Sequence, residues 1–249
     1  MRRKLATTLA GLGGLAVLAA GLELVIRLGW LSALVVAPPG ALPAAVAKLW
    51  AEGQVLAPFF TTMAQAFAAT LLAAFVGVPA GYLTWKRPAL GDAYEPWLGA
   101  AFAAPVILLY PLFLVTMGRG YVTTVFVGFL AAAIPVVLKT REGLLGVPPV
   151  LIAVGRSLHV TPRQLLGRVV LPAAAPTVFT GLRLGLIYAL VNIIGIEYLI
   201  DFGGLGRVVS EMHYRFEIPA MYAAIAMIVT VSLIFLLALR RLERWLRPR

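Results

Sequence analysis

Long apolar runs separated by short polar segments make up most of this chain. Five runs contain no Asp, Glu, Lys or Arg and cover residues 5–22, 53–85, 96–118, 120–138 and 218–239. An α-helix needs about 20 apolar residues to cross the hydrocarbon core of a membrane, so each run can span it or nearly so. A sixth span is expected over residues 177–200, with Arg183 near its start and Glu197 near its end.

The pattern therefore predicts an all-α polytopic membrane protein with six transmembrane helices. The alternation of apolar and polar residues that is typical of a membrane β-barrel is absent. No internal repeat, low-complexity segment or linker divides the sequence, so residues 1–249 are interpreted as a single transmembrane domain.

Composition agrees with this interpretation. Hydrophobic residues make up 61% of the chain and charged residues 12%, whereas ordinary globular chains carry roughly a quarter charged residues. The net charge of +11 would suggest nucleic-acid binding in a soluble protein. Here it predicts topology instead, because Lys and Arg concentrate on the cytoplasmic loops of membrane proteins.

The basic residues divide unevenly between the two sides of the predicted spans. With the amino terminus inside, fifteen of the 21 lie on the inner side and five on the outer side, and Arg183 lies just within the inner boundary. The inner set is Arg2, Arg3, Lys4, Lys86, Arg87, Lys139, Arg141, Arg156, Arg163, Arg168, Arg240, Arg241, Arg244, Arg247 and Arg249, and the outer set is Arg27, Lys48, Arg119, Arg207 and Arg215. We therefore expect both termini and the segment 139–176 to face the cytoplasm.

The first apolar run has two interpretations. Residues 1–22 have the basic start and the small residues of a signal peptide. However, the run resumes after Glu23 with three more apolar residues, which favours an uncleaved first span. After it, residues 42–50 are expected to form a short helix on the outer face, with Lys48 and Glu52 in water.

Small residues and prolines mark positions inside the spans. Gly77 and Gly81, and again Gly181 and Gly185, are four residues apart, a spacing that lets helices approach closely in lipid. The third span, 96–117, contains two prolines. Prolines at membrane depth require neighbouring groups or water to satisfy the carbonyls that they leave free.

The longest basic stretch outside the spans and termini runs from residue 139 to 176. It is expected to open with a polar loop at 139–143 and to continue with two helices, 150–158 and 162–171. Thr161-Pro162-Arg163-Gln164 combines a capping box with Pro at the first helical position, which predicts the start of the second helix. Pro172 predicts its end, because helices tend to stop before a proline.

Motifs for nucleotide binding and metal-dependent catalysis are absent. There is no G-x-x-x-x-G-K-[ST] phosphate loop and no H-E-x-x-H sequence. The chain has no cysteine, and its two histidines, His159 and His213, are expected on opposite sides of the membrane. We therefore expect no metal site, no cofactor in this chain and no catalytic residues.

Charged side chains within spans are costly and often functional. Arg183 lies about two turns inside, where its side chain can reach the inner headgroups. For Glu197 several placements stay open: water at the outer surface, pairing with Arg207 or Arg215, the lining of a pathway, or a contact between helices.

The cytoplasmic stretch resembles the loop of the permease subunits of bacterial binding-protein-dependent ABC importers. The motif of that family runs Glu-Ala-Ala, three residues, Gly, nine residues, then Ile, any residue, Leu-Pro. With Leu171-Pro172 on the final pair, Val169 takes the place of the Ile, His159 that of the Gly, and 153–155 that of the opening triplet. Thus Ala153 replaces the family's Glu and His159 its central Gly, which commonly adopts a left-handed conformation that His adopts only at a cost.

Further segments are similar to the nitrate/sulfonate/taurine branch of this family, and the resemblance covers about residues 37–246. They are Ala37-Pro38-Pro39, Pro105, Pro111-Leu112, Gly118-Arg119-Gly120, Leu171 to Pro176, Gly181-Leu182-Arg183, and Glu197 with Gly204-Leu205-Gly206.

The resemblance implies a type I importer permease with a coupling-helix loop between spans four and five. It implies a partner chain with ATP and Mg²⁺, two such ATPase subunits beneath a pair of permeases, and a substrate-binding protein that docks outside at 40–52 and 202–217. The expected coupling residues are Ala153, Val154, Gly155, Arg156, Ser157, His159, Thr161, Pro162, Arg163, Gln164, Arg168, Leu171 and Pro172. ATP binding would move the loop and rock the helices between inward-open and outward-open states.

The expected function is therefore a permease in the bacterial inner membrane, acting as a homodimer on a small solute. The branch implies an anion such as a sulfonate, taurine or nitrate. Two alternatives stay open from the sequence: an ion-coupled carrier or channel that works without an ATPase, and a membrane scaffold. A carrier would be expected to show more ionisable groups in mid-span and inverted repeats.

Overall fold

A computed structural model of the chain describes the backbone of residues 2–32 and 34–246, and the side chains in that range except those of 2–10, 12, 238–240 and 242–246. All regular structure in these residues is helical. The elements are α1 (Arg2–Arg27), η1 (Pro39–Ala41), α2 (Leu42–Ala51), α3 (Leu56–Lys86), α4 (Pro88–Ala103), η2 (Val106–Leu109), α5 (Tyr110–Met117), α6 (Tyr121–Leu145), α7 (Pro149–Ser157), α8 (Pro162–Leu165), η3 (Leu166–Val170), α9 (Leu171–Leu199), α10 (Leu205–Tyr214) and α11 (Ile218–Leu246).

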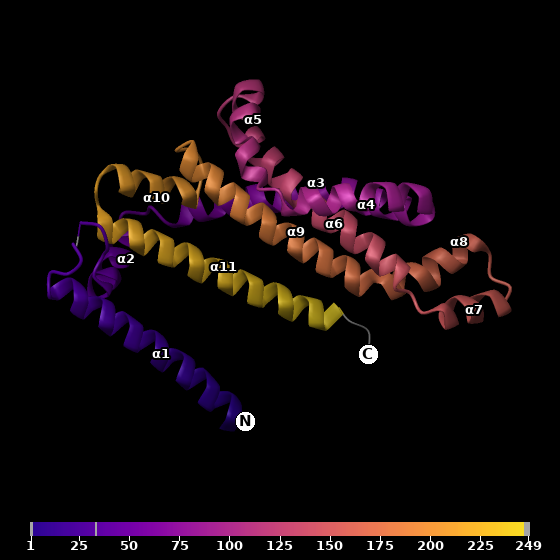
Figure 1. Cartoon of the computed structure of the whole chain (residues 1–249), viewed down its shortest axis with the longest axis horizontal. Coiled ribbons are helices and arrows are strands. Elements are labelled where there is room, and N and C mark those ends of the chain that lie inside the picture. The colour runs from indigo at the N-terminus through magenta and orange to yellow at the C-terminus, as the bar shows by residue number, and fades with distance from the viewer. Residues whose placement is uncertain (1, 33, 247–249) are drawn as a thin grey trace.

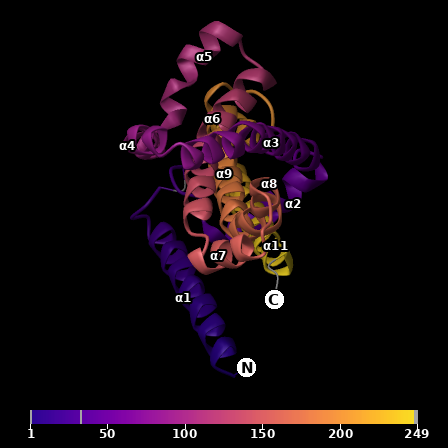
Figure 2. The same cartoon turned by 90° about the vertical axis from the view of Figure 1, so that its right-hand side faces the viewer.

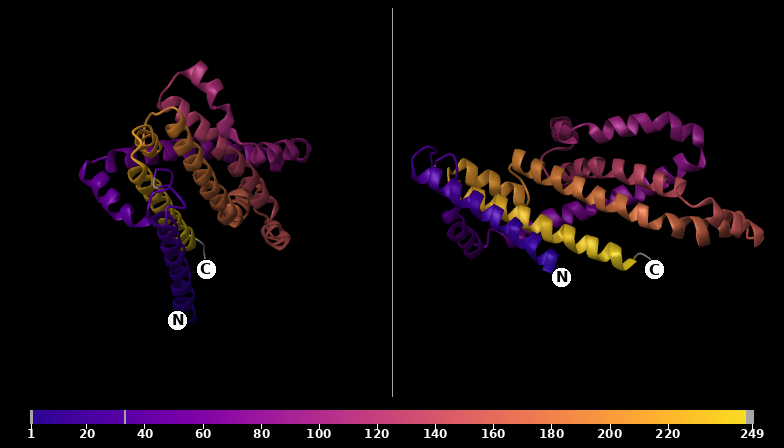
Figure 3. Two further views of the ribbon diagram at one scale, coloured as in Figure 1. Left: turned by 60° about the vertical axis from the view of Figure 1, so that its left-hand side comes forward. Right: turned by 60° about the horizontal axis from the view of Figure 1, so that its bottom comes forward.

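Helix α6 lies between α3 and α9, and the three run lengthwise together (Figures 1 and 3). The predicted glycine pairs make this packing close. A Cβ on Gly81 would lie 2.6 Å from Cβ of Thr140 in α6, and one on Gly185 would lie 3.0 Å from the Ala132 carbonyl oxygen. Small residues at a helix contact let backbones approach, which is how helices gain packing energy in lipid.

The two ends of the bundle carry different elements. Helices α2 and α10 lie at one end and the α7–α8 pair at the other (Figure 1). At the first end, Leu49 of α2 packs in a cluster with Val208, Met212 and Ala223. The predicted helix at 42–50 is therefore confirmed as α2, and Lys48 Nζ donates a hydrogen bond to Glu217 Oε2 (2.9 Å) that raises the pKa of Lys48.

The number of spans that the structure supports is smaller than predicted. Within the described residues, 4 helices are long and apolar enough to cross a membrane: Leu56–Lys86, Tyr121–Leu145, Pro162–Leu199 and Ile218–Leu237. The bent pair Pro88–Ala103 and Val106–Met117 makes up to 5 if it counts as one span. The expected count of six is thus not confirmed. Figure 2 shows α1 and α5 leaving the bundle on opposite sides.

The predicted third span over 96–117 corresponds to a bent pair of helices that begins earlier, at Pro88. The chain turns by 86° between α4 and η2–α5. Pro105 has no N–H to donate to the preceding turn, and Ala104 before it takes an extended conformation (φ −72°, ψ 136°). The helix therefore ends at Ala103 and restarts in a new direction.

Two boundaries expected within residues 139–176 are wrong. Residues 139–143 lie in the last turns of α6 rather than in a loop, since the helix continues through Gly143 to Leu145. The second helix does not stop at Pro172 but runs continuously from Pro162 to Leu199. A π-helical turn precedes Pro172: the Leu171 N–H donates to the Leu166 carbonyl, five residues back. Such turns occur as single-turn bulges within longer α-helices.

Candidate functional site

The α7–α8 pair protrudes from one end of the bundle (Figure 1). Helix α7 begins with Pro149 in its first turn and ends at Ser157. The next residues turn through His159, whose φ of 53° lies in the left-handed region. His159 therefore adopts the left-handed conformation that Gly commonly supplies at this position of the family motif. A non-glycine residue in this region costs of order 1 kcal/mol or more.

The start of α8 agrees with the sequence. Gln164 N–H donates to Thr161 Oγ1 (3.4 Å), and Thr161 N–H donates to Gln164 Oε1 (2.9 Å). This is the predicted capping box, with Pro162 at the first helical position. Because α8 continues through the π-helical turn into α9, the protrusion is joined without a loop to a membrane-length helix.

The pair packs back onto the adjacent ends of α6 and α9, where Ile152 of α7 and Leu165 of α8 lie against a buried cluster. Val147 and Val170 form a buried cluster with Leu144 of α6 and Ala174 of α9. Gly155 is the one buried member of the expected coupling set, and a Cβ there would lie 2.4 Å from Leu165 Cδ1. Helices α7 and α8 thus contact each other closely and are fixed to α6 and α9 as one unit.

The outer surface of the pair is exposed and mixed in character. Four large apolar side chains of this surface are exposed by 41–70%: Val150, Leu151, Val154 and Leu158. The remaining expected residues of the set are exposed as well, namely Ala153, Arg156, Ser157, His159, Thr161, Pro162, Arg163, Gln164, Arg168, Leu171 and Pro172. The sequence analysis emphasised the arginines of this surface and missed its apolar patch.

Glu197 occupies a second site, at the opposite end of the bundle. Its side chain is fully buried. Thr62 Oγ1 lies 2.9 Å from Oε2, the Gly206 N–H donates to Oε2 (3.0 Å), and Gln65 Nε2 lies 3.4 Å from Oε1. The carboxylate therefore joins α9 to α3 and to the first turn of α10, where a negative charge is favourable.

Of the placements left open for Glu197, the structure shows the contact between helices and not the pairing with Arg207 or Arg215. Both arginines bond to Glu211 instead, at 2.7 Å and 2.5 Å. They lie on the same helix face as Glu211, four residues before and after it. Glu197 is also not in water, and Arg183, the other charged residue of this span, is half-buried.

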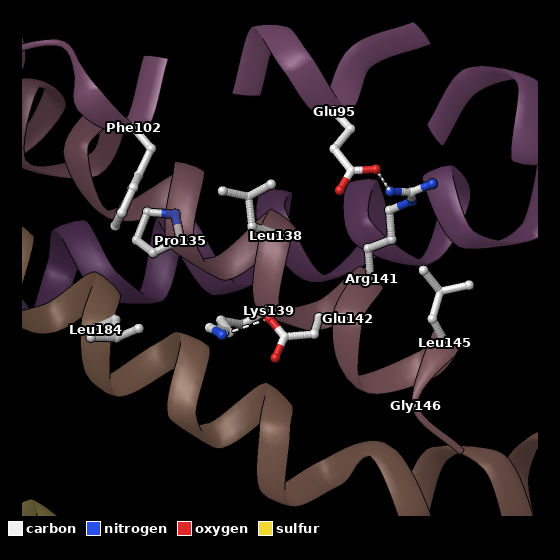
Figure 4. A pocket seen from close by; sticks show the side chains of 10 residues that line it. All are labelled: Glu95, Phe102, Pro135, Leu138, Lys139, Arg141, Glu142, Leu145, Gly146 and Leu184. Atoms are coloured by element: carbon white, nitrogen blue, oxygen red, sulfur yellow. Dashed lines mark hydrogen bonds and ion pairs between the residues drawn. The ribbon is translucent and has the colours of Figure 1, made fainter. Parts of the chain in front are cut away.

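A third feature was not predicted. Arg141 of α6 bonds to Asp92 (2.9 Å) and to Glu95, both on α4. Figure 4 shows the contact with Glu95. The same part of α6 lines a cavity of about 610 Å³ together with α4 and α9. Arg141 was noted in the sequence as a basic residue. Its partners Asp92 and Glu95 were not connected with it, because they precede the expected third span at 96–117, whereas in the structure they lie on α4, the first helix of the bent pair.

No cluster of three or more His, Cys, Asp or Glu residues in the described part of the chain could hold a metal ion.

Comparison with known proteins gives a consistent result. A family described as "Binding-protein-dependent transport system inner membrane component" matches residues 70–249. The taurine transport system permease protein of Escherichia coli is 29% identical over 202 residues, which cover 81% of this chain and 71% of that protein. A probable ABC transporter permease protein of Brucella melitensis is 27% identical over 199 residues, covering 78% of this chain and 80% of that protein.

A further relative and a solved structure extend this result. The bicarbonate transport system permease protein of Synechocystis is 26% identical over 178 residues, 71% of this chain and 64% of that protein. Among solved structures, an inward-facing methionine ABC transporter matches with a TM-score of 0.65 and 23% identity, over 76% of this chain and 93% of that chain. At this identity the match shows a shared fold.

Proposed function

The chain belongs to the family of inner membrane components of binding-protein-dependent transport systems, and from this premise we propose that its α7–α8 pair couples a separate ATPase to the membrane helices. The chain is a multi-pass permease subunit of an ABC importer, the class named for its relatives. In this family the ATPase is a separate chain.

The observation that carries the proposal is the contrast between the two sides of the pair. On one side, Ile152 of α7 and Leu165 of α8 pack against the buried cluster that includes Leu144 of α6 and Ala174 of α9. The other side exposes the apolar patch Val150, Leu151, Val154 and Leu158, next to exposed arginines. Contiguous apolar residues on a water-facing surface commonly mark a protein interface, and movement of a docked rigid unit is an ordinary switching mode.

The arrangement of the complex is part of the proposal. The α7–α8 pair and both termini lie in the cytoplasm, following the excess of Lys and Arg on that side. Two copies of the permease form the transporter, two ATPase subunits that hold ATP and Mg²⁺ dock beneath, and a binding protein docks on α2 and α10 at the outer end. This chain itself holds no cofactor and acts as one domain.

The solute is proposed to be a small anion such as a sulfonate, taurine or nitrate. Support comes from the relatives, which are named for taurine and for bicarbonate. Both named molecules are small and carry an anionic group.

Affinity purification of the tagged full chain from its native host, in mild detergent, tests the proposal. We expect an ATPase subunit and an exported binding protein to follow it. Arg163→Glu, on the exposed surface of the pair, should reduce recovery of the ATPase, whereas Arg87→Glu, at an exposed basic position outside the pair, should not. Recovery of this chain alone, also after crosslinking, would contradict the proposal and favour a carrier without an ATPase.

A further inference from the structure

An apolar groove of about 460 Å³ lies beside α6, between the last turns of α3 and the first half of α9. Its volume falls within the range of about 300–1,000 Å³ that is usual for small-molecule sites. Among the described residues that line it, only Tyr82 and Thr140 have a polar side-chain group, and the hydroxyl of Thr140 is buried. The groove is therefore suited to the apolar part of an amphipathic ligand.

The wall of the groove is partly open and extends along α9. Leu171 and Phe179, which line it, are 46% and 42% exposed. From Leu171 to Leu182, which also lines it, an α-helix rises by about 16 Å. This length is about half of the 30 Å hydrocarbon core of a bilayer. The groove thus has about the depth of one leaflet, which is the space that the acyl chain of a phospholipid occupies.

Aromatic and basic residues lie together at one end of the groove. The ring of Tyr82 packs against that of Trp85, one turn further along α3, with the ring centroids 5.6 Å apart. Lys86 Nζ lies 5.8 Å from the centroid of the Tyr82 ring. Tyr and Trp are enriched at membrane–water interfaces, and Lys side chains near helix ends extend to the same level. These residues therefore place this end of the groove among the lipid headgroups.

The α9 side of this end is basic as well. Arg168 lies in η3, two residues after Leu166, which lines the groove. Lys86 and Arg168 are both exposed, and neither forms an ion pair with a carboxylate in the part of the chain that the structure describes. Two cations beside an apolar groove at headgroup level complement the charge of an anionic phosphate.

Acidic residues near the ends of these helices do not offset the two charges. Asp92 and Glu95, in the helix that follows α3, both bond to Arg141. Glu142, in the last turns of α6, bonds to Lys139. These carboxylates are therefore already paired, and Lys86 and Arg168 keep their positive charge available to a ligand.

We propose that this groove binds an anionic phospholipid, with one acyl chain between α3 and α9 and the phosphate beside Lys86 and Arg168. Other positions in the bilayer are as apolar as the groove, so its wall holds the chain by close packing rather than by the hydrophobic effect. The two cations supply the selectivity among lipids, as basic pockets between transmembrane helices do for anionic headgroups. Binding of this lipid requires neither the ATPase nor the solute.

Photo-crosslinking of the full chain in mild detergent tests the site. The probe is a phosphatidylglycerol, an anionic phospholipid, with a diazirine near the end of one acyl chain, and peptide mass spectrometry locates its adducts. We expect adducts on residues 78–82 of α3 and 171–182 of α9. Unlabelled phosphatidylglycerol should compete at least about tenfold more effectively than zwitterionic phosphatidylethanolamine.

A pair of double variants tests the headgroup contact. Lys86→Gln with Arg168→Gln should lower the labelling of both segments by about tenfold, because the site loses its two cations. Arg156→Gln with Arg163→Gln is the matched control. It removes two exposed positive charges from the α7–α8 pair, outside the groove, and should leave the labelling unchanged.

A second pair of variants tests the acyl-chain contact. Ala175 lines the groove, so Ala175→Trp should fill it and lower the labelling at least about fivefold. Ala100→Trp adds the same bulk at an exposed position of α4 and should have no effect. Size-exclusion chromatography shows whether each variant is folded, and if Ala175→Trp is not, the charge variants still decide the question.

Three results would overturn the proposal. The first is an absence of adducts on both segments, or equal competition by the two unlabelled lipids. The second is an equal loss of labelling in the two double variants, since net charge alone would then account for it. The third is that a second copy of the chain covers the groove. In that case the single-cysteine variant Phe179→Cys would form a disulfide-linked dimer, which is easily assigned because the native chain has no cysteine.

Discussion

The hydroxyl of Thr62 bonds to the carboxylate of Glu197 and also to a backbone N–H of α10. Thr62 Oγ1 lies 2.9 Å and 3.0 Å from the two carboxylate oxygens of Glu197, and both residues are fully buried. The same hydroxyl accepts the N–H of Leu205 (2.9 Å) at the start of α10. The pair therefore fixes the proposed outer docking element to α3 and α9.

Glu197→Ala is expected to destabilise the folded protein strongly. It leaves the Thr62 hydroxyl and the Gly206 N–H without their acceptor, and each buried orphan costs about 1–3 kcal/mol. Glu197→Gln keeps an acceptor oxygen and should lose less. Melting of the detergent-purified protein, followed by size-exclusion chromatography after heating, measures both, and Glu52→Ala at an exposed position is the control. A melting temperature for Glu197→Ala equal to that of the control would contradict this role.

Gly81→Ala is expected to separate α3 from α6. The added Cβ would lie 2.6 Å from Thr140 Cβ and 2.7 Å from the Val137 carbonyl oxygen, and the backbone atom cannot yield as a flexible side chain does. Overpacking of this kind typically costs about 1–3 kcal/mol. Gly99→Ala in α4 is the matched control, since its Cβ would meet nothing within 4 Å. Gly99→Ala should leave the free energy of unfolding unchanged or raise it by up to about 1 kcal/mol, because Ala is more favourable than Gly in a helix. Equal losses in the free energy of unfolding for Gly81→Ala and Gly99→Ala would refute the close contact.

His159→Gly is expected to preserve or stabilise the α7–α8 turn. The backbone at this residue has a φ of 53°, which Gly adopts without the steric cost of a Cβ. His159→Val should instead destabilise the turn, because a β-branched residue is a genuine outlier at positive φ. Hydrogen–deuterium exchange of the amides in α7 reports the difference. Slower or unchanged exchange in the Gly variant and faster exchange in the Val variant are expected; the reverse order would show that the His ring is needed for the turn.

The sequence predicted the straight spans well, because a helix that crosses the hydrocarbon core must be about 20 residues long and nearly free of charged residues. It did not predict the bend at Pro105, since proline alone does not determine a break. Pro79, Pro135 and Pro176 all lie inside continuous helices. After the break at Pro105, Ile107 packs on Gly195 of α9, a contact between distant segments that no local pattern shows.

In the candidate sites, too, features formed by neighbouring residues could be predicted and contacts between distant residues could not. The capping box at Thr161–Gln164 was readable because four consecutive residues contain it. The partners of Glu197 were not, because Thr62 and Gln65 are ordinary polar residues of an apolar run and only the fold brings them to the carboxylate. Likewise, Arg141 was assigned to a loop, whereas its helix extends far enough to reach α4.

Arg141→Ala is expected to loosen the first half of α4 from α6. The guanidinium is only 12% exposed while its partners Asp92 and Glu95 are 76% and 60% exposed, so water screens the pair and the loss of stability should be about 0.5–1 kcal/mol. The larger effect is local: hydrogen–deuterium exchange should rise in α4 but not in α3. Arg141→Lys should restore little, because a single ammonium cannot engage two carboxylates as the planar fork does. Arg156→Ala on α7 is the control, and exchange in α4 that rises equally in both variants would show that Arg141 does not hold this helix.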